Sequence, residues 1–199
     1  MFSDEPPFLS GLGVFIFERL PMKKTKLIDS DGFRRTVNRL AHEVVESNKG
    51  GENIVVVGIR TRGDLLARRV ASKIQEIEGH NVNVGTLDIT LYRDDLRGKL
   101  DQPQLHSTEI LFDITGKFLV LVDDVLFTGR TVRAALNALM DLGRPARIEL
   151  LVLVDRGHRE LPIKADYVGK NVPTSTRQEV KVLMEEVDGE DAVLLIDND

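Results

Sequence analysis

The sequence predicts an α/β domain built on a mostly parallel sheet that is flanked by helices. Three short apolar runs, at residues 53–59 (NIVVVGI), 117–122 (KFLVLV) and 148–154 (IELLVLV), are rich in aliphatic and β-branched residues, as strands buried on both faces are. A polar turn follows each run, and a helical pattern follows the first two turns. This alternation of strand, turn and helix is typical of a parallel sheet.

Three helices are expected around these strands. Residues 33–49, 65–79 and 132–142 each repeat apolar side chains at helical spacing, which predicts that one face of each helix packs on the sheet. Gly143 and Pro145 follow the third pattern and predict where that helix ends.

The remaining segments are expected around this core. Residues 82–92 (VNVGTLDITLY) predict a further strand, and residues 181–184 and 192–196 predict two final strands joined by the turn VDGED. Residues 93–113 are a long charged stretch that contains glycine and proline, which favours a mobile loop or an excursion hairpin.

Length and composition limit the kind of protein. The chain has 199 residues, enough for one domain with a substantial core. A net charge of −5 argues against indiscriminate nucleic-acid binding, although a local basic face remains possible. No stretch approaches the roughly 20 apolar residues of a membrane span, and the absence of cysteine fits a reducing compartment. We therefore expect a cytoplasmic protein that makes no membrane contact.

The first 21 residues are expected to be a peripheral extension, followed by a single domain over residues 22–199. Asp4 and Glu5 precede the apolar stretch 8–17, where a secretory signal would carry Lys or Arg. Met22 opens a lysine-rich start (MKKTK), so we hypothesise that the extension reflects a misassigned start codon. The intact mass of the native protein would test this hypothesis.

Polar turns follow the three buried strands in the order RTRG (60–63), DDVLFTGRT (123–131) and DRGHRE (155–160). The carboxyl ends of parallel strands meet at one edge of a sheet, and ligands of such sheets bind beyond that edge. We therefore expect these three turns to form one site.

The central turn has the residues that a phosphorylated sugar requires. Thr128–Thr131 offer backbone N–H groups and hydroxyls at a helix N-terminus, where the peptide dipoles favour a phosphate, and Gly129 lets the backbone approach closely. Asp123 and Asp124 only accept hydrogen bonds, which suits the vicinal hydroxyls of a ribose. A nucleotide P-loop is disfavoured because Asp124 occupies the position of its first glycine. The alternative is a solvated turn at a strand end.

Residues 120–132 (VLVDDVLFTGRTV) resemble the phosphoribosyl pyrophosphate motif of the type I phosphoribosyltransferases. The resemblance implies their Rossmann-like fold with a small hood and a flexible loop, an enzyme that transfers ribose 5-phosphate to a nitrogen base, and Mg²⁺ as cofactor. It also implies that Asp123 and Asp124 hold the ribose hydroxyls. The phosphates would be held by residues of the same motif, which are Val125, Leu126, Phe127, Thr128, Gly129, Arg130 and Thr131.

Residues 58–63 (GIRTRG) resemble the diphosphate loop of the family, which often contains a cis peptide. The resemblance implies that Arg60, Thr61 and Arg62 lie near the diphosphate. Arg93, at the start of the charged stretch, would close over it, so the catalytic residues implied are Asp123, Asp124, Arg60 and Arg93. A surface turn for residues 60–63, and an exposed loop charge for Arg93, are the alternatives.

The expected base is a pyrimidine. Purine enzymes of the family commonly carry an acid where this chain has Phe127. Residues 87–96 and 153–175 resemble a branch of the family that converts uracil and phosphoribosyl pyrophosphate to UMP and diphosphate, a likeness that extends over residues 26–197. In that branch Arg156, Gly157 and His158 correspond to the uracil site, partly through backbone groups. His158 is expected to position the base rather than to act as a general base.

The same branch regulates pyrimidine operons by attenuation, in which the protein binds leader mRNA when UMP is present. The likeness implies an RNA-binding face, assembled across a homodimer or a higher homo-oligomer, whose residues are Asn38, Arg39, His42, Arg159, Lys164 and Lys170. Ser47, where relatives often carry Arg, weakens this expectation. The alternatives are a solvated helix face on a uracil salvage enzyme without a regulatory role, and a nucleotide sensor without useful turnover.

Overall fold

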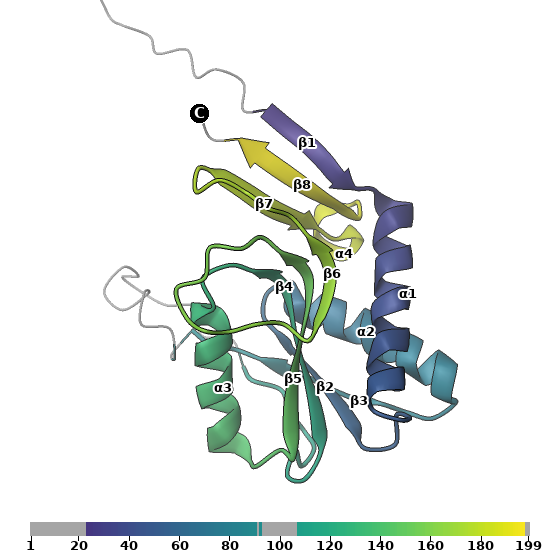
Figure 1. Cartoon of the computed structure of the whole chain (residues 1–199). Helices are drawn as coiled ribbons and strands as arrows, with labels where there is room; N and C mark the ends of the chain where they lie inside the picture. Colours follow the sequence, from purple (N-terminus) through teal and green to yellow (C-terminus); the bar gives the residue numbers. More distant parts are fainter. Residues whose placement is uncertain (1–22, 91, 93–106, 198–199) are drawn as a thin grey trace, which may run out of the picture.

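The computed structural model describes residues 23–90, 92 and 107–197, and it contains two sheets (Figure 1). The larger sheet has five strands in the order β3-β2-β4-β5-β6, and every neighbouring pair is parallel. Its strands are β2 (Ile54–Ile59), β3 (Asn83–Leu87), β4 (Phe118–Leu126), β5 (Arg147–Asp155) and β6 (Tyr167–Asn171). The predicted α/β fold with a parallel sheet is confirmed.

Helices cover both faces of this sheet. The helices are α1 (Ser30–Ser47), α2 (Gly63–Glu78) and α3 (Arg130–Leu142). Buried side chains of α1 and α2 pack with Val56, Val120 and Leu153 on one face, whereas those of α3 pack with the alternate strand residues on the other. This division follows from the two-residue period of a strand, which sends successive side chains to opposite faces.

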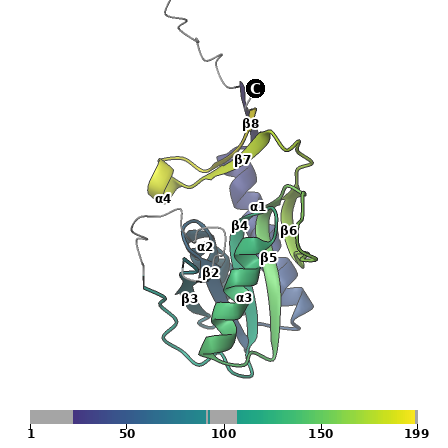
Figure 2. The same cartoon turned by 90° about the vertical axis from the view of Figure 1, so that its left-hand side faces the viewer.

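The smaller sheet is antiparallel, in the order β1-β8-β7. It consists of β1 (Lys23–Ile28), β7 (Gln178–Leu183) and β8 (Ala192–Asp197), and the short helix α4 (Glu185–Asp188) joins the last two strands. We call these four elements the hood. Figure 2 shows the hood above the parallel sheet, with α4 extending toward the side of α2.

Several strands differ from the sequence prediction: β1 was not predicted, β3 is shorter than expected and β7 begins earlier, and β4 and β6 differ as well. β4 was expected to end at Val122, but it continues through both acids to Leu126, because Asp123, Val125 and Leu126 remain paired with β5. β6 was not predicted, since its sequence YVGKN is short and half polar; it forms because β5 offers a free edge for pairing.

Some expectations lie outside the described residues. Most of the charged stretch does, including Arg93, and its described part forms a bridge from Glu109 to Thr86 of β3. Residues 1–21 also lie outside, so the peripheral extension stays a prediction. None of the helices described is long and apolar enough to cross a membrane.

Candidate active site

The phosphate loop, which we define as residues 127–131, joins β4 to α3. Gly129 caps the helix with a φ of 90°, a conformation that favours glycine, and its carbonyl accepts the first helical bond from Arg133 N at 2.9 Å. A cavity of about 390 Å³ opens at this helix N-terminus. It is lined by the residues predicted from the sequence, Asp123, Val125, Leu126, Phe127, Thr128, Gly129, Arg130 and Thr131, together with Val132 and Glu160.

The two adjacent acids line different cavities. Asp123 is buried and lines the cavity of the phosphate loop, whereas Asp124 lines a second cavity of about 390 Å³ beneath β7. The acids separate because neighbouring residues of a strand point to opposite sides. Each carboxylate is held by the next backbone N–H, Asp123 by Asp124 N at 3.0 Å and Asp124 by Val125 N at 2.8 Å. The strand end therefore presents acceptors on both sides, as a sugar lying across it would need.

Burial raises the pKa of the Asp124 carboxyl, because the buried charge loses its hydration. The hydrogen bond from Val125 N and the positive charge of Arg62 act in the opposite direction. Arg62 also lines the second cavity, so a cation from the turn after β2 faces the acid at the end of β4. This arrangement brings the first two predicted turns together.

The diphosphate loop, which we define as residues 58–63, follows β2. The peptide bond between Arg60 and Thr61 is cis, as the family likeness implied. The loop packs closely on β4: a Cβ atom at Gly63 would lie 2.6 Å from the carbonyl oxygen of Val122. A glycine is required here because any side chain would push the loop away from the acids.

Each arginine of the diphosphate loop has one buried nitrogen atom that makes no hydrogen bond among the described residues. The Nε atoms of Arg60 and Arg62 have no hydrogen-bond partner among the described residues. Arg60 lies at 4.0 Å from Glu109, and Arg62 donates to Asp188 in the hood. Buried N–H donors without partners are uncommon, and an anion bound at this loop would supply acceptors.

The base segment, which we define as residues 156–158, follows β5 and surrounds Phe127. The guanidinium of Arg156 lies 4.0 Å from the centre of the Phe127 ring, and the His158 ring meets the same ring edge-on at 6.1 Å. Gly157 and His158 both have positive φ values, 78° and 57°. The third turn is therefore bent back over the phosphate loop.

Both side chains of the base segment are already engaged. Arg156 donates to the carbonyl of Gln178 at 2.6 Å, and His158 Nε2 lies 2.6 Å from the carbonyl oxygen of Thr174. These contacts tie the segment to the chain that leads into β7. The two side chains therefore hold the segment in place.

The comparisons with known proteins agree with this geometry. Residues 25–186 match the phosphoribosyl transferase domain. The chain is 61% identical over 175 residues to the bifunctional protein PyrR of Pelotomaculum thermopropionicum. The aligned region covers 88% of this chain and 97% of that protein. The chain is 63% identical over 172 residues to PyrR of Thermus aquaticus, covering 86% and 95%. The chain belongs to the PyrR group of the phosphoribosyltransferase family.

Solved phosphoribosyltransferases share the fold. Hypoxanthine phosphoribosyltransferase from Trypanosoma cruzi, in complex with IMP, superposes with a TM-score of 0.66 over 90% of this chain and 93% of that one. At 17% identity this likeness concerns the fold alone. The predicted type I phosphoribosyltransferase fold is thereby confirmed.

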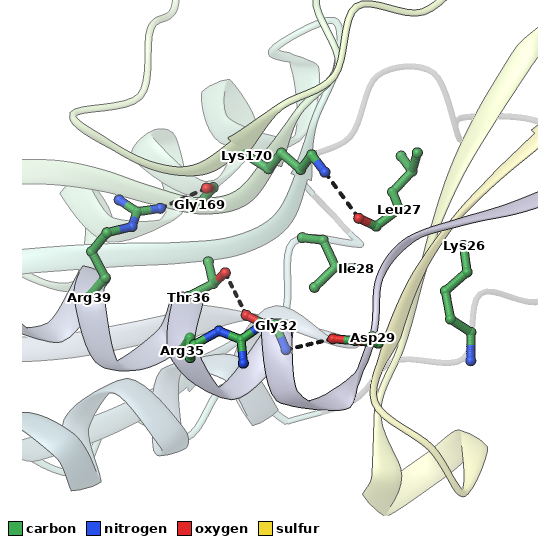
Figure 3. A pocket seen from close by; sticks show the side chains of 10 residues that line it. All are labelled: Lys26, Leu27, Ile28, Asp29, Gly32, Arg35, Thr36, Arg39, Gly169 and Lys170. Carbon is green, nitrogen blue, oxygen red and sulfur yellow. Dashed lines mark hydrogen bonds between the residues drawn. The ribbon is translucent and has the colours of Figure 1, made fainter.

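The residues expected to bind RNA do not gather on one face of this PyrR-group fold. Arg39 on α1 and Lys170 on β6 line one groove of about 600 Å³, in which Arg39 donates to Gly169 O at 2.7 Å and Lys170 to Leu27 O at 3.0 Å (Figure 3). His42 is exposed one turn further along α1. Asn38 lines a separate cavity between α1 and α2, where its Oδ1 has no partner among the described residues.

Arg159 does not join the α1 face. Its guanidinium donates to the carboxylate of Asp155, to Phe127 O at 2.9 Å and to Ile163 O at 3.0 Å. It therefore braces the phosphate loop and the base segment from behind. Lys164 is exposed on the connection between β5 and β6.

Two cations of the groove were not among the predicted residues. Lys26 and Arg35 also lie on its lining, and we call Lys26, Arg35, Arg39 and Lys170 the basic groove (Figure 3). Lys26 pairs with Glu190 at 2.8 Å, and Arg39 pairs with Glu43 at 2.5 Å. The lysine-rich start of the domain was a sequence signal for Lys26. Nothing in the sequence placed β1 beside β6, which only the folded chain does.

Proposed function

We propose that this protein converts uracil and phosphoribosyl pyrophosphate to UMP and diphosphate, and that it regulates a pyrimidine operon by UMP-responsive binding to leader RNA. One observation carries the enzymatic part. The phosphate loop, the acids of β4, the diphosphate loop and the base segment meet at the carboxyl edge of one sheet. Three separate segments of the chain that suit different parts of this substrate support a single site.

Each part of the sugar has a partner. The 5′-phosphate binds backbone N–H groups of the phosphate loop, at the N-terminus of α3. The ribose hydroxyls donate to Asp123 and Asp124, on the two sides of the strand end. The diphosphate binds the diphosphate loop with its arginines Arg60 and Arg62 and with Thr61, and Arg93 closes over it.

Magnesium is the expected cofactor. The described residues contain no group of three or more His, Cys, Asp or Glu side chains that could hold a metal ion unaided. This fits an ion that keeps several waters and is bound through one or two carboxylates together with substrate oxygens. Asp123 and Asp124 are the residues that would contribute. The ion supplies positive charge to the diphosphate leaving group.

Catalysis depends on the leaving group and on excluding water. The bond from the anomeric carbon to the diphosphate breaks through a state with oxocarbenium character, so groups that stabilise the departing charge lower the barrier. Arg60 is the residue that stabilises the departing diphosphate, and its guanidinium is partly shielded from solvent. Closure of the loop that contains Arg93 protects the reactive sugar from water.

Base choice follows from Phe127 and the base segment. Phe127 offers no carboxylate to a purine ring proton, and it fills the space beneath Arg156. Uracil is recognised by backbone groups of residues 156–158. Because His158 Nε2 is in hydrogen-bond contact with Thr174 O, His158 positions the segment rather than taking a proton from the base.

The regulatory part rests on the basic groove and on the likeness to PyrR proteins, whose name describes them as bifunctional. RNA is bound through loops and bulges by cations and polar groups. The groove, His42 and the exposed Lys164 supply such groups on a chain of net charge −5. Of the residues expected from the sequence, the RNA-binding ones are Asn38, Arg39, His42, Lys164 and Lys170, joined by Lys26 and Arg35, whereas Arg159 is engaged behind the phosphate loop. The assembled protein is a cytoplasmic homodimer or higher homo-oligomer.

Two assays on the purified chain test both parts. UMP formation is measured from uracil and phosphoribosyl pyrophosphate with Mg²⁺, beside hypoxanthine as a control base. Binding to the leader RNA of its own operon is measured with and without UMP across a salt series. Turnover of hypoxanthine in preference to uracil would contradict the enzymatic part. Uracil turnover without UMP-dependent RNA binding would leave the alternative, a salvage enzyme.

A further inference from the structure

Helix α4 of the hood reaches the diphosphate loop through one ion pair. Arg62 Nη2 donates to both carboxylate oxygens of Asp188, at 3.1 and 3.2 Å. The two side chains are only 28% and 17% exposed, so water screens the pair weakly. Asp188 Oδ2 also accepts from Met184 N at 3.0 Å, which fixes the carboxylate within the hood. Arg62 is thereby held by an acceptor that cannot move freely.

Arg62 stands where three parts of the site meet. It follows the cis peptide of the diphosphate loop and immediately precedes α2. It shares the second cavity with Asp124 and with β7 residues Glu179–Val182. A change in the position of Arg62 would therefore move the backbone N–H groups beside which the diphosphate lies.

A separate pair of contacts attaches the hood to α2. Arg69 donates to Glu186 at 2.6 and 2.9 Å and to Asp191 at 2.7 and 2.9 Å. Arg69 lies about two turns further along α2 than Arg62, away from the diphosphate loop. The hood thus stays attached to α2 without Asp188, and the Asp188–Arg62 pair has a local rather than a general role.

We propose that Asp188 is a positioning residue for the diphosphate part of the substrate: by holding Arg62 it fixes the diphosphate loop against the hood. This inference rests on the proposed function, since it concerns how that site holds phosphoribosyl pyrophosphate. A loop held in its binding geometry loses less freedom when the ligand arrives, so it binds more tightly. Asp188 itself does not touch the reacting atoms.

The test is an Asp188→Asn variant, which keeps an oxygen for Met184 N but removes the charge that holds Arg62. Binding of pyrophosphate and of phosphoribosyl pyrophosphate, each with Mg²⁺, is measured by calorimetry. We expect both affinities to fall about tenfold, the scale of effect seen when positioning is lost. UMP has no diphosphate, so its affinity should stay within about twofold, which also shows that the variant is folded.

Glu186→Gln is the matched control, because it breaks an ion pair between the same short helix and α2 away from the loop. It should leave all three affinities unchanged. Asp188→Glu, which keeps the charge, should recover part of the lost diphosphate affinity. Equal losses in Asp188→Asn and Glu186→Gln, or an equal loss of UMP affinity in Asp188→Asn, would mean that the pair merely supports the hood and would overturn the inference.

The wild-type measurements separate this inference from the proposed function. Wild-type protein that binds phosphoribosyl pyrophosphate but does not use uracil would contradict the proposed base while the effect of Asp188→Asn on diphosphate still stands as support. Unchanged pyrophosphate binding in Asp188→Asn, beside normal uracil turnover, would overturn the inference alone. Wild-type protein that binds neither diphosphate ligand would overturn both.

Discussion

Arg156 covers the ring of Phe127 at 4.0 Å while its Nη2 donates to Gln178 O at 2.6 Å. One side chain thus connects the phosphate loop, the base segment and the start of β7. Arg156 is 8% exposed, and burial lowers its pKa because the charged guanidinium loses hydration. Through its contacts with Phe127 and Gln178, Arg156 holds the base segment in a fixed position.

Replacing Arg156 by Ala should loosen the base segment. We expect the KM for uracil to rise about tenfold, because the segment must be ordered when the base binds, while the KM for phosphoribosyl pyrophosphate stays within about twofold. Steady-state kinetics with each substrate varied in turn measures this. Arg147→Ala is the control, since Arg147 stacks on Phe118 at 5.1 Å at the opposite end of the sheet. Equal changes in both KM values would refute the assigned role.

Asp124→Asn should make the protein more stable and less active. Burial raises the pKa of Asp124 above its ordinary carboxyl value of 3.8, so the folded protein holds the proton more tightly than the unfolded chain. Wild-type stability therefore decreases as the pH rises from that ordinary value through the raised pKa, and the cost of the desolvated charge is complete only above the raised pKa.

The Asn variant carries no such charge. Above the raised pKa its Tm should exceed that of the wild type by about 2–4 °C, and the difference should shrink as the pH falls and Asp124 takes up its proton. Its kcat/KM should fall about 10²-fold, because the ribose loses an ionised acceptor. Thermal melts between pH 4 and pH 8 and uracil turnover measure both effects. A variant that is less stable than the wild type at pH 7 would contradict the account.

Gly63→Ala should damage both folding and catalysis. Its Cβ would lie 2.6 Å from the backbone oxygen of Val122, and neither backbone can yield without separating the diphosphate loop from the acids. We expect a loss of about 1–3 kcal/mol in the free energy of unfolding, together with at least a tenfold fall in kcat/KM. Denaturant unfolding and initial rates test the two parts.

Gly79→Ala is the matched control for Gly63→Ala. Gly79 ends α2 with a φ of 73°, so alanine there costs about 1 kcal/mol of stability, yet nothing lies within 4 Å of the added methyl group. Its kcat/KM should stay close to that of the wild type. A Gly63→Ala variant that loses stability but retains full activity would show that the close packing on β4 is not needed for the site.

Arg35→Ala should weaken binding to leader RNA and lower the dependence of log K on log salt concentration by about one unit, as expected for one lost phosphate contact. Arg144→Ala is its control, because Arg144 is exposed in the turn after α3 and does not line the basic groove. Filter binding at several salt concentrations, with saturating UMP, measures both. An unchanged salt slope for Arg35→Ala would remove Arg35 from the RNA-binding face.

The parallel core and the chemistry of its edge could be predicted from the amino-acid sequence. Residues 54–59, 118–122 and 148–154 are apolar enough to be buried on both faces, and the polar turns after them had to meet at one edge. The thirteen residues from Val120 to Val132 then indicated a phosphorylated ribose. Hydrophobic period and local turn chemistry are properties of neighbouring residues, so they can be read without the fold.

The contacts between distant segments could not be predicted without the folded chain. β6 forms because β5 offers an edge, and the basic groove forms because β1 and α1 lie beside β6. The contact of Arg62 with Asp188 joins residues 126 positions apart, and neither shows any local sign of the other. Arg159, expected on the RNA-binding face, braces the phosphate loop instead of lying beside α1. Such pairings depend on chain topology, because a long side chain binds whichever acceptor folding brings within its reach.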